Sequence, residues 1–138
     1  MTGSAERLAW GAWALVVSGD GPLRAQARLG LREAGLRCED AVSGRAGLAL
    51  VEEPRRDYVL VVLDLELPDL SAVELQAIAS ITLPEAAYLL CGLGPVAPPG
   101  IETRRITGPV WMAKPCAAAD FAGTIKDLRN GIRLLGAG

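Results

Sequence analysis

The stretch Tyr58-Val-Leu-Val-Val-Leu-Asp64-Leu-Glu-Leu-Pro-Asp69 contains the most apolar run of the chain, and a carboxylate follows that run directly. A continuous apolar run bounded by turn-forming residues is typical of a strand buried on both faces, as in a parallel sheet. In open α/β sheets, ligands bind beyond the carboxyl ends of the strands. We therefore expect Asp64 to lie at the sheet edge where chemistry takes place.

A second strand ends in a charge of the opposite sign. Val110-Trp-Met-Ala-Lys114-Pro115 is a short apolar strand, then a lysine, then a proline that ends it. The carboxyl ends of parallel strands meet at one edge of a sheet, so Lys114 can form an ion pair with Asp64. That pair can also be purely structural, with Lys114 serving only to neutralise Asp64.

Strand and helix patterns alternate along the rest of the chain. Short apolar runs predict strands at 13–17 and 86–91, and the segment 37–42 is predicted as a more modest strand. Pro22 and Ser43 mark helix starts, and Ser71-Ala-Val-Glu74 is a capping box that opens a third helix. The short helix after Ser43 runs through Ala46, Ala49 and Leu50. Helical spacing gives the other helices an apolar face: Leu23, Ala27, Gly30, Leu31 and Ala34; Leu75, Ile78 and Ala79; and Phe121, Ile125, Leu128, Ile132 and Leu135.

Five short strands that alternate with helices predict the α/β class, with a doubly wound parallel sheet. One crossover departs from the pattern, because the segment 92–100 holds three prolines and three glycines. Each proline costs about 3 kcal/mol in a helix interior. We expect the fourth helix to be shortened to a single turn near 101–105 or replaced by a loop. Residues 1–12 are expected to form an N-terminal arm, and residues 13–138 one domain.

The composition narrows the functional classes. The chain has 138 residues, 51% of them hydrophobic, which is enough for one domain with its own core. It contains no histidine, the commonest general base and metal ligand. Its net charge of −2 is scattered, so no basic footprint for nucleic acid or anionic lipid is present. Cys38, Cys91 and Cys116 have no CxxC spacing, which favours free thiols in a reducing compartment.

The N-terminal apolar run, 8–17, is a poor signal peptide. Glu6 offsets the charge of Arg7, and Ser18-Gly-Asp20 is a poor cleavage site. No apolar run approaches the roughly 20 residues of a membrane span. We therefore expect a cytoplasmic protein without membrane contact.

The order and spacing of these residues over roughly 13–135 resemble the receiver domain of response regulators in two-component signalling. The resemblance implies a flavodoxin-like sheet with strand order 2-1-3-4-5. It makes Asp64 the counterpart of the phosphoacceptor, followed by Pro68 and Asp69 of the same loop. Lys114-Pro115 match the family outright. Cys91 takes the position of a threonine or serine, and Trp111 that of the switch aromatic.

The resemblance also identifies a departure from the family. The acidic pair that follows the first strand falls on Ser18 and Gly19, with Asp20 one position beyond. Receivers use this pair to hold Mg²⁺, which neutralises the anions that meet during phosphoryl transfer. A serine and a glycine supply no charge, and Cys91 is a poor hydrogen-bond donor. We expect no cofactor, with Mg²⁺ absent or bound weakly through Asp20 and Asp64.

Three functional readings remain open. The first is an atypical receiver, or pseudo-receiver, that is not an enzyme and acts by protein contact, with impaired Mg²⁺-dependent phosphorylation. The second keeps Asp64 phosphorylatable, with Asp20 rescuing some metal affinity. The third is a small flavodoxin-like ligand-binding protein or enzyme that uses a cleft around Asp64, Cys91 and Lys114. Against the third stand the absence of histidine and of a glycine-rich phosphate loop. Simpler roles are also open, with Cys91 as core filler and Trp111 packed on the sheet edge.

The expected partners are signalling proteins, such as a histidine kinase or an output domain, and not nucleic acid. Receivers usually dimerise through the face of the fourth helix, fifth strand and fifth helix. Without that helix, Arg104 and Arg105 stand beside a loop, so we expect any homodimer to use another face. Trp10 together with the first or fifth helix is the expected alternative, because an exposed tryptophan is a strong anchor.

Overall fold

A single parallel sheet of five strands, in the order β2-β1-β3-β4-β5, organises the computed structural model, which describes residues 7–97 and 109–130. This is the predicted doubly wound sheet with the predicted strand order. The strands are β1 (Trp13–Val17), β2 (Arg37–Ala41), β3 (Tyr58–Asp64), β4 (Ala87–Gly92) and β5 (Val110–Ala113). The helices are α2 (Gly21–Glu33), α3 (Gly44–Glu52), α4 (Ala72–Thr82) and α5 (Ala118–Arg129).

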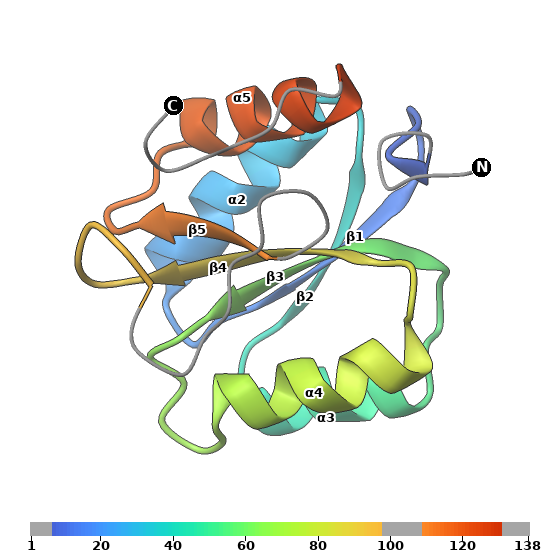
Figure 1. The fold of residues 1–138 in the computed structure, drawn as a ribbon, viewed down its shortest axis with the longest axis vertical. Helices are drawn as coiled ribbons and strands as arrows, with labels where there is room; N and C mark the ends of the chain where they lie inside the picture. The colour runs from blue at the N-terminus through green and yellow to red at the C-terminus, as the bar shows by residue number, and fades with distance from the viewer. Residues whose placement is uncertain (1–6, 98–108, 131–138) are drawn as a thin grey trace.

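The sheet is covered on both faces, which makes three layers (Figure 1). Helices α2 and α5 lie together over one face, and α3 and α4 lie over the other. Strand β3 runs through the middle of the sheet, and every one of its residues is buried. The continuous apolar run therefore became a central strand because helices exclude water from both of its faces.

Short polar side chains fix the starts of three helices. Asp20 accepts a hydrogen bond from Leu23 N at the start of α2, and Ser71 accepts one from Glu74 N at the start of α4. Ser43 caps α3 in the same way. Each side-chain oxygen satisfies a backbone N–H that has no partner within the helix. The predicted caps at Ser43 and Ser71 are confirmed.

The buried face of α3 includes two glycines. Ala49 is exposed, while Gly44, Gly47 and Val51 are the buried residues of the helix. A Cβ added at Gly47 would lie 2.7 Å from Val17 Cγ1 on β1. Gly47 therefore lets the helix approach the sheet closely, a contact that a search for apolar side chains overlooks.

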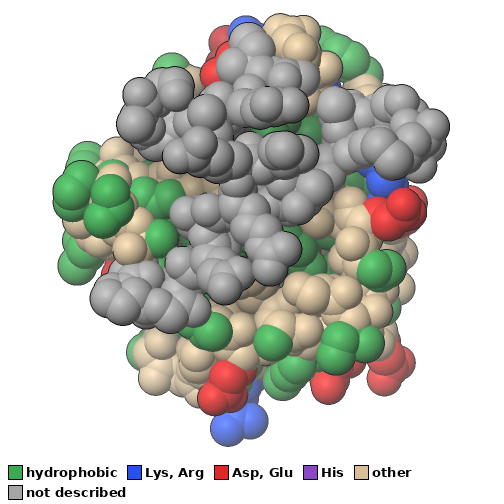
Figure 2. Space-filling model, in the orientation of Figure 1, with side chains coloured by type: hydrophobic (Ala, Val, Ile, Leu, Met, Phe, Trp, Pro, Cys, Tyr) green, Lys and Arg blue, Asp and Glu red, His purple; other side chains and the backbone are tan. Residues whose placement is uncertain are grey.

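The crossover that follows β4 contains no helix over its described residues, 93–97. The chain there bends, and Leu93 and Val96 are exposed. Figure 2 shows hydrophobic side chains gathered at the edge where Figure 1 has the chain leaving β4, while charged side chains on this face lie scattered. The single turn expected at 101–105 and the end of the last helix, with Ile132 and Leu135, lie outside the described residues. No helix in the described part of the chain is long and apolar enough to cross a membrane.

The described part of the N-terminal arm, 7–12, is bound to the sheet and helices. Leu8 is fully buried in the core beneath α2 and α5. Gly11 N donates to Gly35 O at 2.7 Å, which ties the arm to the turn between α2 and β2. Arg7 forms a two-pronged ion pair with Asp57. These residues are therefore part of the packed domain.

Candidate functional site

Asp64 is the last residue of β3, and its side chain is only 2% exposed. Lys114 Nζ lies 2.7 Å from its Oδ1, and the backbone N–H of Glu66 donates to the same oxygen at 2.9 Å. Ser18 Oγ donates to Oδ2 at 2.6 Å. Both carboxylate oxygens are therefore bound by groups of the chain itself.

Lys114 follows β5 and reaches Asp64 across the carboxyl edge of β4. Its backbone N–H donates to Gly92 O at 2.8 Å, which continues the β4–β5 pairing past the end of the strand. Its ammonium group also lies 2.6 Å from Glu66 Oε1. Lys114 thus binds two carboxylates, one buried and one partly exposed. The expected Asp64–Lys114 pair is present, and Glu66 is a member that the sequence reasoning missed.

These contacts keep both partners charged. Burial by itself raises the pKa of Asp64, but the hydrogen bonds from Lys114, Ser18 and the Glu66 amide outweigh it and bring that pKa below its usual value. Burial likewise lowers the pKa of Lys114, and the two carboxylates outweigh it, so that its pKa is raised. At neutral pH, the Asp64 carboxylate is therefore an anion bound by the Lys114 ammonium group and the Ser18 hydroxyl group.

Ser18 stands at the end of β1 and is 1% exposed. Its hydroxyl group accepts from Asp20 N at 3.0 Å while it donates to Asp64. Its carbonyl oxygen accepts from Arg24 Nη1 at 2.8 Å. Sequence comparison treated Ser18 as a lost acid, whereas the structure places it as a hydrogen-bond donor to the carboxylate beside it.

Asp20 and Gly19 do not complete a carboxylate cluster at Asp64. The side chain of Asp20 accepts a hydrogen bond from Leu23 N and so caps α2, which the sequence did not predict. Gly19 has no side chain to offer. Lys114 and Ser18 already bind the oxygens of Asp64, and Lys114 also binds the neighbouring Glu66 carboxylate. This donor set does not fit Mg²⁺, which requires several oxygens in octahedral geometry.

Cys91 lies beside Asp64 in the β3–β4 register and is fully buried in the core. A hydrogen bond with Cys116, together with burial, raises the pKa of its thiol far above the usual value. The hydrogen bond from Cys91 lowers the pKa of Cys116. Cys91 therefore packs as a small apolar residue, in keeping with core filler, and presents no thiolate to the site.

Trp111 lies on β5 and packs over the end of β4. Its indole N–H donates to Gly94 O at 3.2 Å. A Cβ added at Gly92 would lie 2.5 Å from the ring, so the absence of a side chain there lets the indole approach the backbone. Trp111, which the resemblance matches to the switch aromatic, thus forms a contact at the sheet edge between β5 and the crossover loop.

Asp69 serves a structural purpose near the site. Its carboxylate accepts hydrogen bonds from the backbone N–H groups of Gly44 and Arg45, at 2.9 and 3.0 Å. These bonds at the start of α3 lower the pKa of Asp69. The loop after β3 is thereby tied to the neighbouring helix.

The site opens toward a hollow of about 290 Å³ between the start of α2 and the loop after β5. Leu23, Leu93 and Pro115 contribute apolar surface to it, and Lys114 stands at its rim. The arrangement can hold charge and offer apolar surface. Among the described residues, no group of three or more histidine, cysteine or acidic side chains is placed to hold a metal.

Comparison with solved structures shows the fold of response-regulator receiver domains. The chemotaxis response regulator CheY4 of Vibrio cholerae has 19% identity and a TM-score of 0.72, with 86% of this chain and 98% of that chain covered. A CheY-like receiver domain protein of Methanospirillum hungatei has 21% identity and a TM-score of 0.71, with coverage of 87% and 94%. The BeF3-activated receiver domain of DrrB, a Thermotoga maritima protein, has 21% identity and a TM-score of 0.67, with coverage of 87% and 98%.

At these identities, the likeness concerns the fold. No protein-family profile matches the sequence, and no curated protein matches it either.

Proposed function

We propose that this chain is a receiver-like module of two-component signal transduction that acts by protein contact and is not an enzyme. Phosphorylation of Asp64 that depends on Mg²⁺ is impaired in it. The observation that carries the proposal is the state of Asp64, whose two oxygens are bound by Lys114, Ser18 and the Glu66 amide. The receiver-like fold supports the signalling role, and the contacts of Asp64 support the impaired phosphorylation.

Charge balance supports the loss of metal dependence. In this site, the anion Asp64 faces the cation Lys114 at 2.7 Å, and Lys114 also neutralises Glu66. A divalent cation that approached Asp64 would have to displace the Ser18 hydroxyl group or stand beside the ammonium group. Either move costs interactions, and the neighbouring Glu66 carboxylate is itself already bound by Lys114.

Exposed apolar surface near the site supports a role in protein contact. Leu93 and Val96 lie open on the crossover loop, and the hollow next to Lys114 has apolar walls. Contiguous apolar surface of this kind is where partner proteins bind. The proposed partners are a histidine kinase or an output domain, and contact with them would depend on the conformation of this edge.

The proposal is tested by amide NMR during a titration with Mg²⁺, followed by beryllofluoride, which mimics an acyl phosphate. We expect no saturable shift of the Asp20 or Asp64 amides at low millimolar Mg²⁺, and no beryllofluoride complex. Asp64→Asn is the matched control, because any shift that persists in it arises from another carboxylate. Saturable shifts in the parent chain that vanish in the control would instead establish a phosphorylatable receiver with Asp64 as acceptor.

A further inference from the structure

The strand β2 forms an edge of the sheet and has backbone groups without partners. It pairs with β1 alone. The backbone groups of Arg37 and Ala41 point toward β1, because Arg37 N–H donates to Ala12 O and Ala41 O accepts from Ser18 N–H. In a parallel ladder, the residues between these point their N–H and C=O outward. Cys38 and Asp40 are those residues, and within the described chain no hydrogen bond reaches their backbone from the open side.

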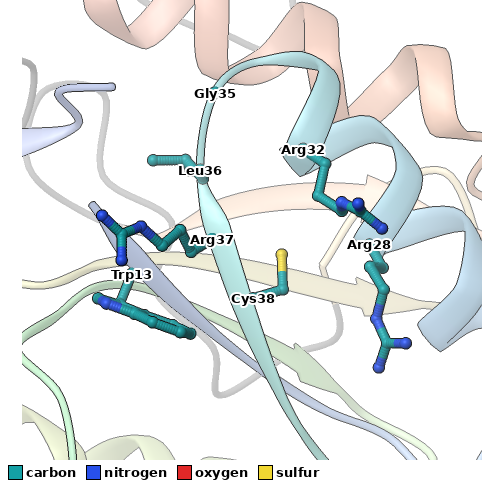
Figure 3. Close-up of a pocket in the computed structure, with 7 residues that line it drawn as sticks. All are labelled: Trp13, Arg28, Arg32, Gly35, Leu36, Arg37 and Cys38. Atoms are coloured by element: carbon teal, nitrogen blue, oxygen red, sulfur yellow. The ribbon is translucent and has the colours of Figure 1, made fainter. Parts of the chain in front are cut away.

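A basic hollow of about 520 Å³ surrounds the first half of this edge. Arg28, Arg32 and Arg37 line it, and no acidic residue does. Figure 3 shows Arg28 and Arg32 extending from α2 with Cys38 pointing toward them, while Arg37 and Trp13 lie on the other side of β2. Guanidinium groups therefore flank the strand on both faces, although the chain as a whole is acidic.

Two of these arginines have no acidic partner within the described part of the chain. Asp40 pairs with Arg28 and lies 4.0 Å from Arg24. Within the described residues, neither Arg32 nor Arg37 forms an ion pair with a carboxylate. Unneutralised guanidinium groups beside an open backbone edge attract carboxylates that can be bonded bidentately.

The aromatic residue of the hollow does not favour a flat ligand. The guanidinium groups of Arg37 and Arg56 already lie over the Trp13 ring, at 5.5 and 4.3 Å from its centroid. A nucleobase or other planar ring would have to displace them. An extended peptide would instead bind the backbone groups of the open strand edge and the arginines on its two faces.

We propose that the free edge of β2 binds an extended acidic segment of a partner protein, which adds to the sheet as a further strand. Its backbone would bond the outward N–H and C=O groups of Cys38 and Asp40. Successive side chains of a strand point to opposite faces. Two consecutive acidic residues would therefore reach Arg32 on one face and Arg37 on the other.

This inference deepens the proposed function, and it rests on that function only in assigning the segment to a signalling partner. The hollow is built around the amino ends of β1 and β2, whereas Asp64 stands at a carboxyl end. Binding at β2 can therefore be measured without any change at Asp64. A failure here would leave the proposed function standing, because Mg²⁺ and beryllofluoride test that separately.

The test is titration of the chain with the peptide acetyl-Thr-Val-Glu-Glu-Val-Thr-amide, followed by amide NMR and calorimetry. We expect shifts at Cys38 and Asp40, and affinity that falls as salt is raised. Arg32→Gln and Arg37→Gln should each weaken binding by about fivefold to tenfold, since each removes a charge-assisted hydrogen bond. Arg45→Gln is the matched control, because Arg45 is exposed in the first turn of α3, does not line the hollow and should leave affinity unchanged.

Two further ligands separate backbone pairing from simple charge attraction. The peptide with both glutamates replaced by glutamine, and the acidic peptide N-methylated at alternate positions, should each lose binding at least tenfold. Equal binding of the N-methylated peptide would overturn the strand-addition proposal. So would tight binding of inorganic tripolyphosphate that competes with the peptide without shifting Cys38 and Asp40, since the hollow would then be a small-anion site.

Discussion

Asp64 keeps its charge in a buried position because donors of three kinds meet it: an ammonium group, a hydroxyl group and a backbone amide. Removing a carboxylate from water is costly unless its oxygens are bonded in this way. Lys114 depends on the arrangement equally, since Asp64 and Glu66 are its acidic partners in the described chain. The pair therefore stabilises the fold only while both groups are ionised.

Stability should fall at both ends of the pH range. The pKa of Asp64 is lowered on folding, so its contribution is complete above its unfolded value of about 4 and is lost as pH drops through the lower folded pKa. The pKa of Lys114 is raised on folding, so its contribution is complete below about 10.4 and is lost as pH rises through the higher folded pKa. Urea unfolding measured from pH 2.5 to 11.5 checks both limbs.

Asp64→Asn is the control for the acid limb. The amide keeps the size of the side chain and some of its hydrogen bonds, so we expect the free energy of unfolding at pH 7 to change by no more than about 3 kcal/mol, in either direction. The acid limb should become shallower in this variant. An unchanged acid limb would show that other carboxylates control stability there.

Restoring the acidic pair should restore metal binding. In the double variant Ser18→Asp with Gly19→Asp, two carboxylates join Asp64, and calorimetry should detect Mg²⁺ at low millimolar concentration. Without metal the variant should be less stable, because the Ser18 bond to Asp64 is replaced by repulsion between like charges. Added Mg²⁺ should reverse that loss. Failure to bind metal in a folded variant would contradict the idea that the missing acids alone impair the site.

Residue types predicted the site only in part. The sequence placed Asp64 and Lys114 at one edge, because the ends of parallel strands meet there. It did not predict the hydrogen bond from Ser18, since a serine after a strand is common and its partner depends on strand order. It also did not predict Glu66, which reaches Lys114 only because the turn after β3 folds back.

At the scale of elements, prediction succeeded where apolar side chains defined the pattern. Strand β1 has the expected bounds, and the expected inward face of α2 is buried through Leu23, Ala27 and Leu31. It assigned no inward face to α3, where Gly47 is buried against the sheet and Ala49 is exposed. A glycine carries no hydropathy signal, so close backbone approach is visible only once the neighbouring strand is in place.

Two helical glycines should respond to alanine in opposite ways. A Cβ at Gly30 of α2 would lie 2.1 Å from Ala118 O and 2.8 Å from Phe121 Cβ, so Gly30→Ala must push α2 and α5 apart. We expect it to destabilise the fold by about 1–3 kcal/mol. Gly123 of α5 has no neighbour within 4 Å of the added carbon, so Gly123→Ala should stabilise by about 0.5–1 kcal/mol. Thermal and urea unfolding of the two variants measure both changes in the free energy of unfolding.

At the scale of the whole molecule, the surfaces open to partners are distributed around the sheet. The carboxyl edge presents Lys114 beside Leu93, and the β2 edge presents arginines. The N-terminal arm adds Trp10, whose side chain is 74% exposed although it lies over Gly35 and within 5.4 Å of the Arg129 guanidinium group. These three surfaces therefore lie at different places on the one domain.

Self-association of this chain should depend on Trp10. The described crossover residues, 93–97, contain no helix, whereas Trp10 is largely exposed and packs against Gly35 and the Arg129 guanidinium group. Trp10→Ala should weaken any dimer seen by sedimentation at least tenfold, because a central tryptophan is worth about 2 kcal/mol or more at an interface. Ile81→Ala, on the equally open surface of α4, should not. A dimer that tolerates Trp10→Ala but is lost in a Leu93→Ala variant would assign pairing to the carboxyl edge instead.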